Sequence, residues 1–124
     1  MRIRNANIYT EEHRFVRGDA AVENGRFVSC TGEPAGEEAV VDAEGMYLIP
    51  GLVDIHFHGC KGADMCDGTK EALDVITSYE ASVGVTSVCP ATMTIPKDEL
   101  LEVMKNAGSY EYSGGSHLVG INME

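Results

Sequence analysis

The chain has 124 residues, of which 44% are apolar and 23% charged, so it is long enough to form a compact domain with a buried core. Its formal net charge of -11, without any basic cluster, argues against a nucleic-acid surface and against binding to anionic lipid. The most apolar window, residues 46–55, falls far short of the roughly 20 residues that a membrane helix needs.

The N-terminal segment and the cysteines favour a cytoplasmic protein. Residues 1–13 carry charge but no apolar stretch of the kind found in secretory signals. The cysteines show no CxxC spacing, which is typical of reduced thiols, with a Cys60–Cys66 disulfide as an alternative. They are Cys30, Cys60, Cys66 and Cys89.

Residues 1–49 are expected to form short strands separated by turns. AAVENGRFVSC, residues 20–30, has apolar residues on both sides of Asn24-Gly25, which favours a type I′ hairpin because both turn positions need positive φ. EEAVVDAEGMYLI, residues 37–49, predicts a second unit of this design, in which strands at 39–41 and 46–49 flank an Asp-Ala-Glu-Gly turn. The first third of the chain therefore reads as a small all-β module.

A β-α unit follows Pro50. The run GLVDI, residues 51–55, predicts a strand buried on both faces, as strands of a parallel sheet are. A glycine-containing loop leads to a predicted helix over residues 70–83, for which Gly84 is the expected C-cap. Its apolar residues recur at helical spacing: Ala72, Leu73, Ile76, Tyr79 and Val83.

The same pattern then repeats. A second strand is predicted over residues 85–89, and a second helix begins near Pro96, a residue that suits a first helical turn. Its buried stripe is expected to consist of Leu100, Leu101, Met104 and Ala107. A third apolar run, HLVGINME, occupies residues 117–124.

The order β-α-β-α-β predicts an α/β fold with a parallel sheet and right-handed crossovers. Three strands and two helices leave exposed sheet edges, and a complete β/α barrel takes about 250 residues. Residues 50–124 are therefore interpreted as the first three strands and two helices of a (β/α)8 barrel, and the chain as the N-terminal part of a larger polypeptide.

Candidate metal ligands follow two of these strands. His56 and His58 are two residues apart at the end of the first strand, so both imidazoles can point to the same side. Neutral imidazole binds Zn²⁺ and similar cations, although a His-x-His pair alone is a weak signal and can simply close a strand. Glu124, at the end of the third strand, adds a carboxylate at the same rim.

Several stretches together carry a resemblance to a known family. The run LIPGLVDIHFHG, the preceding DAEG turn, the stretch GVTSVCPATMT and the closing GINME resemble the N-acetylglucosamine-6-phosphate deacetylase family of the amidohydrolase superfamily. The resemblance covers essentially the whole chain. It implies that residues 1–49 belong to a small β-sandwich domain and residues 50–124 to a metal-dependent hydrolase barrel.

The resemblance also implies an activity. It implies hydrolysis of the acetamide of N-acetylglucosamine 6-phosphate, with His56, His58 and Glu124 as ligands of one or two divalent ions, zinc or iron. Family members would act on a small amino-sugar phosphate, and the full-length protein is expected to be a homodimer. The general acid/base has no counterpart in these 124 residues, so no catalytic residue is assigned here and the chain alone is expected to be inactive.

Two other functions stay open. The alternatives are a cyclic-amide hydrolase resembling dihydropyrimidinase, and a non-catalytic fragment without metal.

Some residues near the site are expected to have simpler roles. Asp54 is expected to cap the backbone or support a ligand rather than act as a base. Cys60 and Cys66 are expected to pack in the loop, and Lys61 to be solvated.

Overall fold

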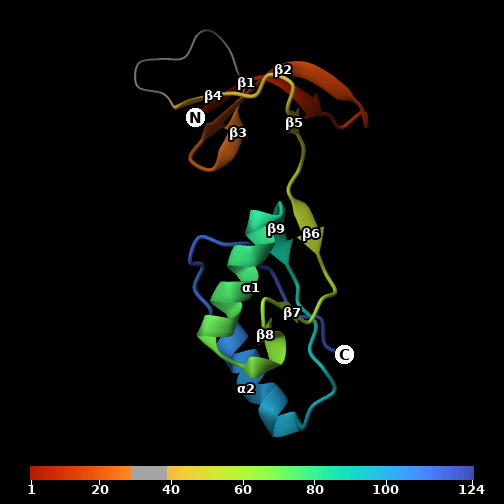
Figure 1. The fold of residues 1–124 in the computed structure, drawn as a ribbon, viewed down its shortest axis with the longest axis vertical. Helices are drawn as coiled ribbons and strands as arrows, with labels where there is room; N and C mark the ends of the chain where they lie inside the picture. Colours follow the sequence, from red (N-terminus) through yellow and green to blue (C-terminus); the bar gives the residue numbers. More distant parts are fainter. Residues whose placement is uncertain (29–38) are drawn as a thin grey trace. The chain divides into compact units, whose positions relative to one another are not determined.

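The computed structural model describes residues 1–28 and 39–124, which divide into two compact units, Met1–Pro50 and Gly51–Glu124 (Figure 1). The end of the predicted hairpin, including Cys30, lies outside the described residues. None of the described helices is long and apolar enough to cross a membrane.

The first unit is a single sheet whose described strands are β1 (Arg2–Tyr9), β2 (Phe15–Glu23), β3 (Arg26–Val28), β4 (Val40–Asp42) and β5 (Tyr47–Leu48). The order is β3-β2-β1-β4, with β5 also beside β1. The hairpin predicted around Asn24-Gly25 is confirmed, since β2 and β3 pair antiparallel and the two turn residues have φ of 50° and 73°. These are the positive φ values that a type I′ turn requires.

The second predicted hairpin is wrong. β4 and β5 do not pair with each other; both run parallel to β1, with Ile3 opposite Val41 and Ile8 opposite Leu48. The turn between β4 and β5 does not reverse the chain. The Ala43 N–H donates to the Arg4 carbonyl at 2.8 Å, and this bond keeps the segment beside β1. Both apolar runs form strands, but the chain does not reverse direction between them.

The second unit is a mixed α/β structure. Its three parallel strands, β6 (Leu52–Asp54), β9 (Val85–Val88) and β10 (His117–Leu118), lie in the order β10-β9-β6. A small hairpin of β7 (Gly59–Cys60) and β8 (Ala63–Asp64) precedes the 3₁₀ turn Met65–Asp67. The helices are α1 (Lys70–Ser82) and α2 (Lys97–Gly108), and the described residues form no closed barrel.

The core of this unit lies where both helices meet the 3₁₀ turn. Met65, Leu73, Val103 and Ala107 form one buried cluster there. Thr69 caps α1 by accepting a hydrogen bond from the Ala72 N–H at 3.2 Å, and α1 ends next to Gly84, as predicted. These contacts hold α1 against α2 and the 3₁₀ turn.

Two predictions about burial are wrong. On α2, Leu101 is 50% exposed whereas Val103 is 3% exposed, so Val103 replaces Leu101 in a stripe that still contains the buried Ala107. The first parallel strand is not covered on both faces, since Val53 is 61% exposed. The reason is that, among the strands that the structure describes, β6 stands at the edge of the sheet and has β9 as its one neighbour.

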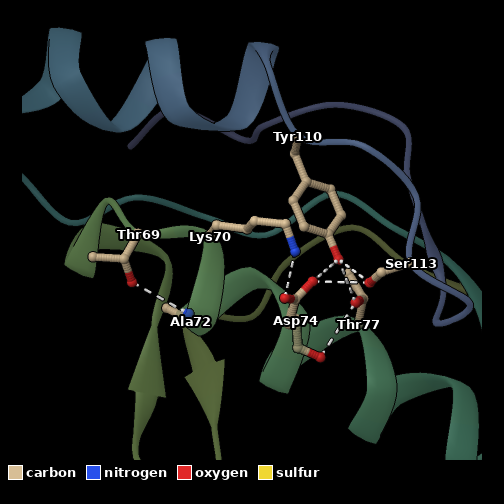
Figure 2. Close-up of polar contacts among 7 residues, drawn as sticks. All are labelled: Thr69, Lys70, Ala72, Asp74, Thr77, Tyr110 and Ser113. Atoms are coloured by element: carbon tan, nitrogen blue, oxygen red, sulfur yellow. Dashed lines mark hydrogen bonds and ion pairs between the residues drawn. The ribbon is translucent and has the colours of Figure 1, made fainter.

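A polar cluster joins α1 to the segment after α2 (Figure 2). Asp74 accepts hydrogen bonds from the Tyr110 hydroxyl at 2.9 Å and from the Ser113 hydroxyl at 2.8 Å, and its other oxygen lies 2.6 Å from the Lys70 ammonium. Further along the chain, Ser116 donates to the Val85 carbonyl at 2.7 Å. The cluster, called here the Asp74 cluster, therefore anchors the segment that leads into β10.

Candidate metal centre

The segment carrying the two histidines follows β6 and is fixed by backbone hydrogen bonds on both sides. The Ala91 N–H donates to the Phe57 carbonyl at 2.7 Å, and the Met65 N–H donates to the His58 carbonyl at 2.8 Å. Asp54 also accepts from the His56 N–H at 3.0 Å, so its carboxylate caps the turn after β6. The capping role expected for Asp54 is therefore what the structure shows.

Glu124 reaches the same rim because parallel pairing continues past the ends of β9 and β10. Asn122 donates from its backbone to the Pro90 carbonyl at 2.9 Å and accepts from the Thr92 N–H at 3.0 Å. The hydroxyl of Thr92, a fully buried residue, then accepts from the Glu124 N–H at 3.3 Å. The sheet thus positions the backbone of Glu124 opposite the histidine segment.

The side chains of His56, His58 and Glu124 converge. The distance from Nε2 of His58 to Oε2 of Glu124 is 3.6 Å, and that from Nε2 of His56 to Oε1 is 4.0 Å. The two imidazole rings are nearly perpendicular, at 80°, with centroids 5.7 Å apart. One candidate ligand atom from each residue lies within 4.8 Å of the others, and the group is open to solvent.

This donor set fits a divalent transition-metal ion. Two imidazole nitrogens and a carboxylate oxygen are ligands that zinc accepts, at about 2.0–2.2 Å from the ion. Ligands of a tetrahedral ion at those lengths are roughly 3.3–3.6 Å apart, so shifts of about 1 Å would close the group around it. The separations exceed a good N–H···O hydrogen bond, which leaves the three side chains facing one another without a direct bond.

The remaining residues near the site have the simpler roles. Cys60, Cys66 and Cys89 are free thiols, so the alternative Cys60–Cys66 disulfide is absent. Burial raises the pKa of the Cys60 thiol, and the nearby Glu80 raises it further, which disfavours the thiolate that a metal needs. Cys66 accepts a hydrogen bond from the Met93 N–H at 3.2 Å, and the Lys61 ammonium lies 4.9 Å from the centre of the Tyr79 ring.

One residue at the site was missed from the sequence. The side-chain nitrogen of Asn122 donates to the Ile55 carbonyl at 3.0 Å and lies 3.4 Å from Nδ1 of His56. The same i, i+2 rule that paired the histidines would have placed Asn122 on the same side as Glu124. By contrast, Nδ1 of His58 is buried and has no hydrogen-bond partner in the part of the chain that the structure describes.

Comparison with known proteins finds similarity over most of the chain. No family model matches the sequence. The N-acetylglucosamine-6-phosphate deacetylase of Bacillus subtilis is 28% identical over 98% of this chain and 33% of its own length. A dihydroorotase of Lactobacillus gasseri is 32% identical over 83% of this chain and 23% of its own length.

A solved structure shares the fold of the chain. The crystal structure of N-acetylglucosamine-6-phosphate deacetylase from Pasteurella multocida superposes with a TM-score of 0.85 at 21% identity, over 98% of this chain and 33% of that one. The chain thus spans about a third of the length of the deacetylases it matches. It is homologous to the N-terminal third of the N-acetylglucosamine-6-phosphate deacetylases of the amidohydrolase superfamily.

Proposed function

We propose that the chain is the N-terminal part of a metal-dependent hydrolase that converts N-acetylglucosamine 6-phosphate to glucosamine 6-phosphate and acetate. One observation carries this proposal: His56, His58 and Glu124 converge after two parallel strands of one sheet, in a chain that matches a deacetylase over 98% of its length. Catalytic groups of parallel β/α folds gather at this end of the strands.

The proposed domains follow from the same likeness. Residues 1–49 would be part of a β-sandwich, and residues 50–124 would be the first three strands and two helices of a (β/α)8 barrel. Support comes from the TM-score of 0.85 with a deacetylase and from the parallel order β10-β9-β6. The rest of the barrel would then cover the exposed strand β6.

The chemistry divides between this chain and the rest of the protein. His56, His58 and Glu124 would hold one or two divalent ions, zinc or iron. A divalent ion in such a site supplies polarisation of the amide carbonyl and lowers the pKa of bound water toward about 7. The group that passes protons from water to the leaving amine, and the cations that hold the sugar phosphate, are not among these residues, so the 124-residue chain alone is proposed to be inactive.

The proposed partners are few. The substrate would be a small amino-sugar phosphate in the cytoplasm, and the full-length enzyme would be a homodimer. The net charge of -11 supports the view that neither nucleic acid nor an anionic membrane surface is a partner.

A second candidate function is a cyclic-amide hydrolase, because a dihydroorotase also matches the chain. Cyclic-amide hydrolases resembling dihydropyrimidinase usually bridge their metals with a carboxylated lysine from a later strand. The position of Glu124 beside both histidines supports the deacetylase instead. A third candidate, a fragment without metal, is separated from both by metal content.

The deciding experiment is metal analysis of the purified chain by plasma mass spectrometry. Wild type is compared with the double variant His56→Ala/His58→Ala and with the control His117→Ala. His117 is not in the proposed site: its imidazole stacks on the Tyr112 ring, with the two ring centroids 4.3 Å apart. We expect zinc or iron in wild type and His117→Ala, and its loss in the double variant. Equal metal in all three samples, or none in wild type, would refute the proposed site.

A further inference from the structure

We propose that Asn122 is a positioning residue for His56, whose amide group fixes the Nδ1 edge of the imidazole and so determines that Nε2 is the nitrogen offered to a divalent cation. This inference rests on the proposed function of the site. It concerns a residue that neither the histidine motif nor the ligand group contains.

The amide of Asn122 links the ends of two strands that are not neighbours in the sheet. Its nitrogen donates to the Ile55 carbonyl at 3.0 Å and lies 3.4 Å from Nδ1 of His56. Ile55 and His56 follow β6, whereas Asn122 follows β10, and β9 lies between those strands. The amide therefore spans the middle strand and contacts the ring edge opposite Nε2.

The backbone of Asn122 is held firmly enough for this task. It pairs with Ala91 in a parallel bridge, donating to the Pro90 carbonyl at 2.9 Å and accepting from the Thr92 N–H at 3.0 Å. Ala91 in turn donates to the Phe57 carbonyl at 2.7 Å, next to His56. One continuous set of backbone bonds thus fixes both the amide and the ring that it contacts.

An amide can form a hydrogen bond with either tautomer of a neutral imidazole, because it has both an NH₂ donor and a carbonyl acceptor. Its NH₂ group facing Nδ1 matches a ring that carries its proton on Nε2, toward Glu124. When Nε2 binds a cation, that proton goes to solvent and Nδ1 takes one up. A half-turn of the amide, which would give up the hydrogen bond to the Ile55 carbonyl, would then bring the amide oxygen to the Nδ1 proton, the partner that a metal-bound histidine ordinarily has.

The second histidine provides an internal contrast. Nδ1 of His58 is buried without a hydrogen-bond partner among the residues described here, so no comparable group holds that ring. Removal of the Asn122 amide is therefore expected to change His56 and to leave His58 as it is.

The test combines zinc titration calorimetry with long-range ¹H–¹⁵N spectra of the imidazoles, on wild type, Asn122→Ala and Asn122→Asp. Asn122→Ala should weaken zinc binding by about tenfold or more, the usual effect of losing such a partner. Asn122→Asp keeps an acceptor, so it should bind zinc at least as tightly as wild type. In the zinc-free spectra the protonated nitrogen of His56 should move toward Nδ1 in Asn122→Asp, with His58 unchanged.

The outcomes separate this inference from the proposed function. If wild type binds zinc through the histidines and Asn122→Ala binds it equally well, the positioning role is wrong while the metal site stands. If wild type binds no zinc, the proposed site fails and the inference fails with it. Should Asn122→Ala not fold, Asn122→Asp decides: weaker zinc binding and an unchanged His56 spectrum would overturn the role of Asn122.

Discussion

The carboxylate of Glu124 faces the imidazole of His58 across 3.6 Å, although the two residues follow opposite edge strands of the parallel sheet. The segment after β9 lies between them. Its Ala91 N–H donates to the Phe57 carbonyl, and its Thr92 hydroxyl accepts from the Glu124 N–H. Neither side chain has to be drawn from a remote loop. The site is therefore a consequence of parallel strands ending at one rim.

Glu124→Gln tests the charge of this carboxylate while keeping its shape. We expect zinc affinity, measured by calorimetry, to fall by about tenfold or more, because an amide oxygen is a weaker ligand for zinc than a carboxylate. Glu111→Gln removes an exposed carboxylate on the segment after α2 and serves as the control. Equal losses in both variants would mean that net charge alone attracts the cation.

Gly59→Ala tests the tight turn directly after His58. A Cβ at residue 59 would lie 2.0 Å from the Ala63 carbonyl oxygen, across the β7–β8 pair, so the backbone must move. We expect a loss of roughly 1–3 kcal/mol in the free energy of unfolding, from urea denaturation. Gly108→Ala, at a position where an added Cβ meets nothing within 4 Å, should be neutral or stabilising by up to about 1 kcal/mol.

The local parts of this structure could be predicted from sequence, whereas the partners of each element could not. Helix α1 and the Asn24-Gly25 hairpin depend on residues close in the chain, such as Thr69 and Gly25, and both are as predicted. The parallel pairing of β4 and β5 with β1 depends on long-range hydrogen bonds that no short pattern encodes. The convergence of His56 and Glu124 was predictable because strand order and the common rim follow from the β-α alternation.

The i, i+2 rule places Asn122 on the same side as Glu124, but it does not predict the contact of Asn122 with His56. An asparagine near a strand end has many ordinary roles, and its contact with His56 depends on how far the chain pairs beyond β10. The exposure of Val53 likewise depends on which strand stands beside β6 rather than on its apolar character. Sequence periodicity indicates which residues can be buried. Which of them are buried depends on the elements that pack beside them.

The two faces of α2 can be compared by truncating one residue on each. Val103→Ala should lower the free energy of unfolding by roughly 1–3 kcal/mol, because Val103 is in the core cluster with Leu73 and Met65. Leu101→Ala, at a half-exposed position, should change it by about 0.5 kcal/mol or less. Urea denaturation measures the free energy of unfolding of both variants. A larger loss for Leu101→Ala than for Val103→Ala would mean that Leu101 is buried, as the sequence predicts.

The Asp74 cluster should make stability depend on pH in acid (Figure 2). Hydrogen bonds from Lys70, Ser113 and Tyr110 lower the pKa of Asp74 to about 2, below its ordinary value of 3.8. Because the folded-state pKa is the lower one, this stabilisation is complete above about pH 4 and is lost as pH falls toward 2. Asp74→Asn removes this stabilisation at every pH, so wild type and Asp74→Asn should differ most near neutral pH and converge near pH 2.

Thermal melts from pH 2 to pH 6 measure the difference in stability between wild type and Asp74→Asn. The control is Glu11→Gln, which removes an exposed carboxylate in the other unit. A constant difference between wild type and Asp74→Asn across that range would show that the cluster stabilises the fold by packing and not through the charge of Asp74.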